Sequence, residues 1–437
     1  MNGTPFVFFL NEGFCRKDMQ RDEFEIMAPV GSRESLAAAI HAGANSVYFG
    51  IGKLNMRSHS ACAFGIDDLK DIASICQKAG LKSYLTVNTI IYGEDIDTMH
   101  EIVDAAKEAG ISAVIASDVA VMMYCQRVGQ EVHLSTQLNI SNVEALKFYA
   151  QFADVVVLAR ELNMWQVKDI YDQIVQQQIK GPSGQLVRIE MFCHGALCMA
   201  ISGKCYLSLQ NAGRSANRGE CVQICRRGYE VKDIETGTEL KVDNKYIMSP
   251  KDLKTIRFMD VMMNARVRVF KIEGRARGPE YVQTVVSAYN EAIEAVLDGT
   301  FHQDEARLDR WDEELSTVFN RGFWDGYYQG QLLGEWCEVY GSKATEMKVY
   351  VGKCMKYFSK IGVAEFLIEN VDLHVGDKIL VTGTTTGALI QHVDEIRFDL
   401  EPVQTATRGQ HISIKVNERV RPNDKLYVLQ KRSLSNP

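Results

Sequence analysis

Cysteines are concentrated in one short stretch of this chain. Five of the eleven cysteines lie between Cys193 and Cys225, and the last four follow the spacing Cys-x6-Cys-x15-Cys-x3-Cys. These four are Cys198, Cys205, Cys221 and Cys225, and their thiolates can bind structural zinc or an iron–sulfur cluster. Zinc sites usually pair cysteines separated by about two to four residues, and the first pair here is wider. The spacing therefore favours an iron–sulfur cluster, with zinc as the alternative.

The residues around these cysteines are poor material for a core of buried free thiols, because Gly, Arg and Asn dominate them. Cys193 is an exception, because it lies on a predicted strand and is expected to pack there. Cations near the other thiolates can offset their negative charge and hold an anionic substrate. In this stretch five cationic residues accompany one acidic residue, Glu220. The cationic residues are Lys204, Arg214, Arg218, Arg226 and Arg227.

The composition is that of an ordinary globular protein, with 46% hydrophobic and 24% charged residues. No apolar run approaches the roughly 20 residues of a spanning helix, and Pro5–Leu10 lacks the basic start of a signal peptide. We therefore expect a soluble, cytoplasmic protein with no membrane association, no disulfide framework and no evident stable protein partner. The net charge of −7 argues against a general nucleic-acid coat but leaves room for a local basic site.

Short apolar runs alternate with amphipathic helical stretches over the first three hundred residues, which predicts a parallel sheet. Eight such strands are the number that closes a (β/α)₈ barrel, and an open doubly wound sheet is the runner-up. The strands are predicted at Glu25–Val30, Ser46–Gly50, Lys82–Ile90, Ala113–Ser117, Val132–Asn139, Val155–Ala159, Arg188–His194 and Val267–Gly274.

The domain boundaries follow from changes in this pattern. We expect an N-terminal extension over residues 1–22 and a (β/α)₈ barrel over residues 23–340, with a Cys-rich insertion at 196–249 after the seventh strand and before a helix near Leu253. Active sites of such barrels lie at the carboxyl ends of the strands, where this insertion begins. Residues 341–437 read as a small antiparallel β-barrel that resembles the second domain of translation elongation factors.

Alternation along the predicted strands directs polar side chains into the barrel. Lys271 and Glu273 face inward on the eighth strand, and Glu190 and His194 share a face with Phe192 on the seventh. We take Glu190, His194, Lys271 and Glu273 as candidate catalytic groups. Candidate substrate-binding residues are Arg57, Asn88, Gln137, Arg160, Arg214, Arg218 and Arg275, and Ser135 and Asn139 are expected to point the same way as Gln137.

Two of these assignments have a structural alternative. Lys271 can form a buried ion pair with Glu190 or Glu273 and serve stability alone. His194 can be a general acid near the cluster or a packed, hydrogen-bonded histidine. The arginines are better candidates for binding, because a guanidinium group can bind a carboxylate through two hydrogen bonds.

Two segments resemble the signature of peptidase family U32: Glu190–Cys198 and Ser202–Ser208. The opening strand at Met27–Gly31, the late strand at Phe270–Arg275 and the segment Phe319–Phe323 are also similar to that family. The resemblance spans residues 24 to about 340, and the added β domain is similar to that of the longer, tRNA-acting members.

The resemblance implies oxygen-independent hydroxylation with a four-iron four-sulfur cluster. In the tRNA-acting branch it implies 5-hydroxyuridine at the wobble position, with tRNA as partner and prephenate, or a similar small dicarboxylate, as hydroxyl source. Hydroxylation of ribosomal RNA or of a quinone precursor by the same chemistry is an alternative.

Collagenase-like peptidase activity, from which the family takes its name, is a further alternative. The sequence contains neither His-Glu-x-x-His nor Gly-x-Ser-x-Gly, so it shows no standard machinery for peptide hydrolysis. A non-catalytic RNA-binding module would leave the cysteines and the charged barrel mouth unexplained.

Overall fold

The computed structural model describes residues 19–58, 63–229, 232, 234–237, 248–338 and 341–432. The predicted N-terminal extension lies outside the described residues up to residue 18. Its last residues belong to the fold, because Met19 is buried in the core and the 3₁₀ turn η2 (Arg21–Glu23) leads directly into the first strand. Within the described ranges, no helix combines the length and the apolar character needed to cross a membrane.

Eight parallel strands form a closed barrel, as predicted, and the open-sheet alternative is wrong. Each strand pairs with the next, and the pairing of β7 with β9 closes the ring. All eight coincide with predicted strands. They are β1 (Glu25–Pro29), β2 (Ser46–Phe49), β3 (Lys82–Val87), β4 (Ala113–Ala116), β5 (Val132–Leu134), β6 (Val155–Val157), β7 (Arg188–Gly195) and β9 (Val267–Ile272).

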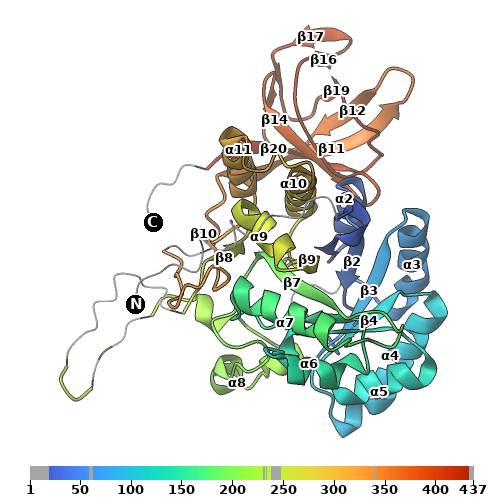
Figure 1. Ribbon diagram of the computed structural model, residues 1–437. Coiled ribbons are helices and arrows are strands. Elements are labelled where there is room, and N and C mark those ends of the chain that lie inside the picture. The colour runs from blue at the N-terminus through green and yellow to red at the C-terminus, as the bar shows by residue number, and fades with distance from the viewer. Residues whose placement is uncertain are drawn as a thin grey trace.

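Amphipathic helices surround this ring (Figure 1). Local sequence sets their ends: the Ser32 hydroxyl accepts a hydrogen bond from the Ser35 N–H and caps α2, as predicted, and Gly110 ends α4 in the left-handed conformation. The helices are α2 (Arg33–His41), α3 (Leu69–Lys78), α4 (Ile96–Ala109), α5 (Val119–Val128), α6 (Val143–Ala150), α7 (Met164–Gln176), α9 (Met259–Asn264), α10 (Pro279–Leu297) and α11 (Glu305–Thr317).

The segment after the Cys-rich insertion differs from the prediction of a helix near Leu253. Residues Asp252–Lys254 form strand β8, which pairs antiparallel with the end of β7 and parallel with β10 (Phe323–Trp324). The helix α9 begins only at Met259, after a 3₁₀ turn at Ile256–Phe258. The returning chain thus adds a small ribbon to the mouth of the barrel.

The middle of the barrel is filled with side chains and is no pore. Inward-pointing residues from six strands make one buried layer: Met27, Tyr48, Tyr84, Ala113, Ile115, Val155 and Val269. Any ligand must therefore bind at one end of the barrel.

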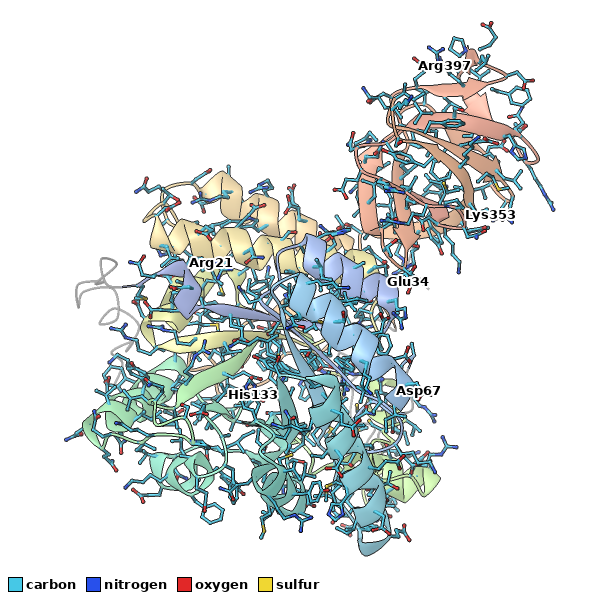
Figure 2. All side chains as sticks on the ribbon, turned by 90° about the vertical axis from the view of Figure 1, so that its right-hand side faces the viewer. Arg21, Glu34, Asp67, His133, Lys353 and Arg397 are labelled. Atoms are coloured by element: carbon cyan, nitrogen blue, oxygen red, sulfur yellow. The ribbon has the colours of Figure 1, made fainter. Side chains whose placement is uncertain are left out.

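Antiparallel strands follow residue 341, as predicted, and form an eight-stranded sheet with its own core. Strand β15 of this sheet packs against α2 and α10, on the outside of the barrel (Figure 2). The strands are β11 (Glu346–Phe358), β12 (Val363–Ile368), β14 (Lys378–Gly383), β15 (Gly387–His392), β16 (Ile396–Phe398), β17 (Glu401–Val403), β19 (His411–Lys415) and β20 (Lys425–Lys431); β13 (Leu373–His374) and β18 (Thr405–Ala406) pair separately.

Gly387 is a point of close approach between this sheet and the barrel. Its φ is +70°, and a Cβ there would lie 2.6 Å from the Ala38 nitrogen in α2. We expect Gly387→Ala to lower the free energy of unfolding by about 1 kcal/mol for the left-handed backbone and by about 1–3 kcal/mol more for the clash. The control is Gly409→Ala, because Gly409 has a φ of +91° and a Cβ added there would meet nothing within 4 Å. If both variants lost the same free energy of unfolding in urea, the close contact between Gly387 and α2 would be contradicted.

Candidate active site

A cavity of about 210 Å³ lies where the carboxyl ends of the strands meet the Cys-rich insertion. The insertion is anchored above the barrel, because the Ser58 hydroxyl donates to the Gly219 carbonyl at 3.1 Å and the Ile90 N–H to the Asn217 carbonyl at 3.1 Å. On the described lining, Glu273 is the one carboxylate among seven cationic side chains. The cations are Arg57, Arg160, Arg226, Lys271, Arg275, Arg277 and Arg321.

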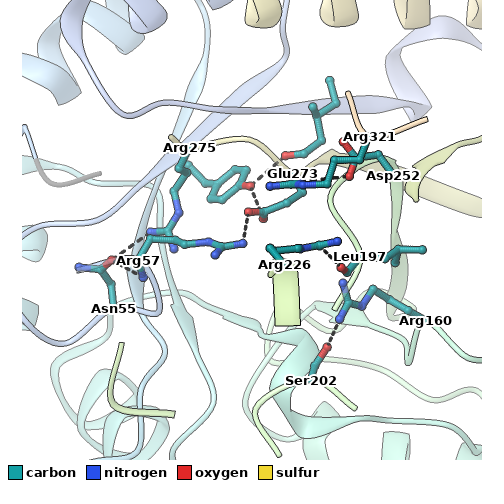
Figure 3. Close-up of polar contacts among 12 residues, drawn as sticks. Asn55, Arg57, Arg160, Leu197, Ser202, Arg226, Asp252, Glu273, Arg275 and Arg321 are labelled. Carbon is teal, nitrogen blue, oxygen red and sulfur yellow. Dashed lines mark hydrogen bonds and ion pairs between the residues drawn. The ribbon is translucent and has the colours of Figure 1, made fainter. Parts of the chain in front are cut away.

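Glu273 is held by two partners (Figure 3). Arg57 Nη2 lies 2.8 Å from Glu273 Oε1, and the Tyr48 hydroxyl lies 3.3 Å from Oε2 and 2.9 Å from the Ile272 carbonyl. Burial by itself raises the pKa of Glu273, but Arg57 and Arg275 outweigh it and the net effect is a lowered pKa. Glu273 is therefore an ionised carboxylate that orients Arg57, which makes it a weak proton acceptor.

Two further arginines are positioned by neutral hydrogen-bond acceptors. Arg275 Nη1 donates to Thr86 Oγ1 at 2.8 Å, and Arg160 Nη2 donates to Ser202 Oγ at 2.7 Å. Among the described residues, Arg160 Nε is buried without a hydrogen-bond partner. Because the Ser202 hydroxyl fixes the Arg160 guanidinium without neutralising its charge, Arg160 can attract an anionic ligand.

Lys271 and Glu190 form an ion pair of 2.7 Å that is almost wholly buried. Lys271 Nζ also lies 4.8 Å from the centre of the Tyr48 ring. Lys271 lies on the cavity lining, whereas Glu190 is fully buried and does not. The pair joins the neighbouring strands β7 and β9. This buried ion pair is the structural alternative that the sequence analysis gave for these two residues.

The thiols of Cys198, Cys205, Cys221 and Cys225 all line this cavity. Burial raises the pKa of Cys225, and the other three thiolates raise it further, although Arg226 opposes them. In the described part of the chain, no three His, Cys, Asp or Glu side chains converge closely enough to hold one metal ion. Four thiols that face one cavity could hold an iron–sulfur cluster or a zinc ion.

Cys193 lies outside the cavity and is fully buried, with its Sγ 3.5 Å from the Lys271 carbonyl. His194 is also outside, which differs from the expectation that it faces the mouth with Phe192. The register of β7 against β9 shifts between Phe192 and His194, so the two side chains no longer share a face. The His194 ring instead packs among Tyr281, Tyr289 and Phe323, and its Nδ1 lies 3.4 Å from the Tyr289 hydroxyl.

Two predicted arginines of the insertion do not line the cavity. Arg218 forms an ion pair with Asp95 and stacks over Tyr92, with 4.1 Å between its Cζ and the ring centre. Arg214 is exposed on the surface. Arg218 therefore joins the insertion to the segment after β3, outside the cavity.

Strand β5 ends at Leu134, earlier than predicted, and a 3₁₀ turn at Thr136–Leu138 follows it. Ser135 and Gln137 still reach the cavity together with Asn88, whose Nδ2 donates to Ser135 Oγ at 3.1 Å. Asn139 is turned away in the left-handed conformation and donates to the Ser202 carbonyl at 3.0 Å.

The cavity residues that were not assigned from the sequence include Tyr48, Arg277 and Arg321. Arg321 pairs with Asp252 at 3.3 Å. Burial, and secondarily the charge of Arg321, lowers the pKa of Arg277 to about 10. The sequence did contain a signal for Arg277, because Arg277 lies two residues after Arg275, which was already a candidate.

Burial and the neighbouring charge of Lys254 lower the pKa of His194 to about 3. Below a pH of about 6.5 the unfolded chain binds a proton that the folded chain does not, so stability falls as the pH falls. We expect His194→Phe, which cannot titrate, to remove up to about 1.4 kcal/mol per pH unit from this slope between about pH 6.5 and pH 3. Urea unfolding of both proteins at several pH values is the measurement, and parallel slopes would contradict the assignment.

Comparison with known proteins places this geometry in a family. Residues 31–337 match the sequence profile of Peptidase family U32. A protein of Porphyromonas gingivalis named collagenase is 66% identical over 95% of this chain and 100% of its own length. The tRNA hydroxylation protein P1 of Bacillus subtilis is 33% identical over 71% of this chain and 74% of its own. The 23S rRNA 5-hydroxycytidine C2501 synthase of Escherichia coli is 32% identical over 63% of this chain and 40% of its own. The chain belongs to peptidase family U32.

Proposed function

We propose that this protein hydroxylates the wobble uridine of tRNA to 5-hydroxyuridine, with a four-iron four-sulfur cluster on Cys198, Cys205, Cys221 and Cys225. A small dicarboxylate such as prephenate serves as hydroxyl donor. The observation that carries the proposal is one cavity that combines four thiols with seven cations and one carboxylate. Relatives named for hydroxylation of tRNA and of ribosomal RNA support the same class of reaction.

The cations account for the binding of both proposed substrates. Arg160 is fixed by the Ser202 hydroxyl and keeps its positive charge for a carboxylate of the donor, and Arg275 lies on the same lining. Reaction at a base requires the nucleotide to leave its stack and enter the mouth, where the remaining arginines can meet its phosphates. The Gln137 side chain lies on the lining, and its amide N–H groups can donate to the edge of the base.

The proposed reaction balances in atoms and electrons. The C5–H bond of the uracil and the C–OH bond of the donor break, and a C5–OH bond and a donor C–H bond form. The base loses two electrons and the donor carbon gains two, so no further oxidant is needed. An iron–sulfur cluster on the four thiols supplies one-electron transfer for such an exchange. The side chains around it bind the donor, exclude water and hold the base against the donor carbon.

Peptide hydrolysis is a second candidate, because the 66% identical relative is named collagenase. Hydrolysis would need a base beside a nucleophile or an activated water. The described lining contains no histidine, and the Ser135 hydroxyl is engaged with Asn88 and Gln137. Glu273 is bound to Arg57, so the cavity supports hydroxylation better than peptide cleavage.

The first test is chemical. Deletion of the gene should remove wobble 5-hydroxyuridine and its derivatives from bulk tRNA, because the proposed transfer of the hydroxyl group from the donor to the base requires this protein. Mass spectrometry of digested tRNA nucleosides measures this, and complementation with the wild-type gene is the control. The anaerobically purified protein should leave gelatin intact. Unchanged nucleosides together with gelatin cleavage would favour the peptidase instead.

The second test concerns the cluster. Cys198→Ala, Cys205→Ala, Cys221→Ala and Cys225→Ala should each lose bound iron and sulfide, because three thiolates hold such a cluster poorly. Cys193→Ala is the matched control and should keep the cluster at a cost of about 1 kcal/mol of stability. Iron and sulfide analysis with visible spectra of anaerobically purified proteins decides it. Loss of iron in the Cys193 variant with retention in the Cys225 variant would overturn the ligand set.

A further inference from the structure

We infer that a shallow hollow beside the active-site cavity is a stacking subsite for a nucleobase next to the one that reacts. This inference rests on the proposed function, since it names how the RNA substrate would be held. The hollow has a volume of about 30 Å³ and opens between the Cys-rich insertion and the segment that follows β10. A space this small takes one face or edge of a ring and does not enclose it.

Three aromatic side chains build the hollow around a glycine. Trp324 and Tyr327 contact edge to face, with ring centres 5.3 Å apart, and Trp336 completes the wall. A Cβ on Gly334 would lie 3.5 Å from the Tyr327 hydroxyl, 3.7 Å from Trp336 and 3.8 Å from Trp324. The missing side chain of Gly334 therefore leaves room between three rings.

The aromatic rings are held in place by the backbone. Trp336 forms a bridge with Pro250, and the Cys337 N–H donates to the Ser249 carbonyl at 2.7 Å. Trp324 Nε1 donates to the Lys251 carbonyl at 3.1 Å. Trp336 is nevertheless 38% exposed, so the wall is both ordered and accessible from outside.

The hollow shares a wall with the active-site cavity. Arg160, Leu197, Cys198 and Met199 line both. Arg160 is 8% exposed, and its Nε has no hydrogen-bond partner among the described residues. A buried donor without a partner at a shared wall is suited to an acceptor on a ligand.

The chemistry of this place fits a nucleobase. Aromatic stacking and arginine contacts are how proteins hold unstacked bases, and each base stacked contributes strongly to affinity. Arg160 and the exposed Glu161 offer a donor and an acceptor to the edge of a base. The adjoining cavity carries an excess of cations. The phosphates of an RNA chain require such positive charge, whereas a neutral peptide does not.

The test uses the full-length protein, purified without oxygen, and an anticodon stem-loop RNA with uridine at the wobble position. Two further RNAs lack the base on the 5′ or the 3′ side of that uridine. We expect wild-type protein to bind the intact RNA about tenfold more tightly than one of the two abasic RNAs. Tryptophan fluorescence should be quenched by the intact RNA. Trp165→Phe is the control and should leave the quenching unchanged, because Trp165 lies on α7 and does not line the hollow.

Gly334→Val fills the hollow without touching the cations, so it should bind intact and abasic RNA equally and keep its iron content. Trp336→Phe retains a ring and should keep much of the preference for intact RNA while losing most of the quenching. Each variant tests the stacking subsite by itself, so the test can still be made if one of the two proteins fails to fold.

The outcomes separate this inference from the proposed function. If wild-type protein binds all three RNAs equally, or Gly334→Val behaves as wild type, the subsite is refuted while RNA binding stands. If no RNA binds and tRNA nucleosides are unchanged in the deletion strain, the proposed function itself has failed. If Gly334→Val reduces cleavage of gelatin and leaves RNA binding intact, the hollow accepts a peptide side chain and the inference is overturned.

Discussion

An excess of buried positive charge is the constraint on which the active site depends. Seven cations and one carboxylate line the cavity, and ions withdrawn from water are costly unless opposite charges accompany them. Asp252 compensates Arg321 from the small ribbon beside β7, and Glu190 compensates Lys271 from within the barrel. The cavity as a whole still needs further negative charge. The four cysteines on the wall of the insertion are groups that could supply it as thiolates.

The barrel could be predicted closely because parallel strands buried on both faces appear as short apolar runs, and each run here is followed by an amphipathic helix. Strand β8 could not be predicted in this way. Its three residues, Asp252–Lys254, are too few to show a period, and their partners are the ends of β7 and β10. This segment is a strand only because it pairs with β7 and β10, which its own sequence does not indicate.

The site was predictable where residues lie close to regular strand ends. The four cysteines, Arg57, Arg160, Arg275, Asn88 and Gln137 all reach the cavity. His194 was misplaced because a register shift breaks the alternation on which its prediction depended. Arg218 is engaged by Asp95, which is 123 residues away in sequence, so no local pattern could indicate that pairing. Arg277 and Arg321 enter the cavity from connecting segments, whose direction periodicity does not encode.

The order of strands along the chain has a consequence for biosynthesis. Strand β9, which closes the ring between β7 and β1, follows the cysteines in sequence. A ribosome releases the chain from its N-terminus, so all four thiols emerge before the strand that completes the barrel. During that interval the thiols lack the four cations of the cavity that are translated later: Lys271, Arg275, Arg277 and Arg321. The surroundings of the four thiols are therefore complete only after the last strand of the barrel has been made.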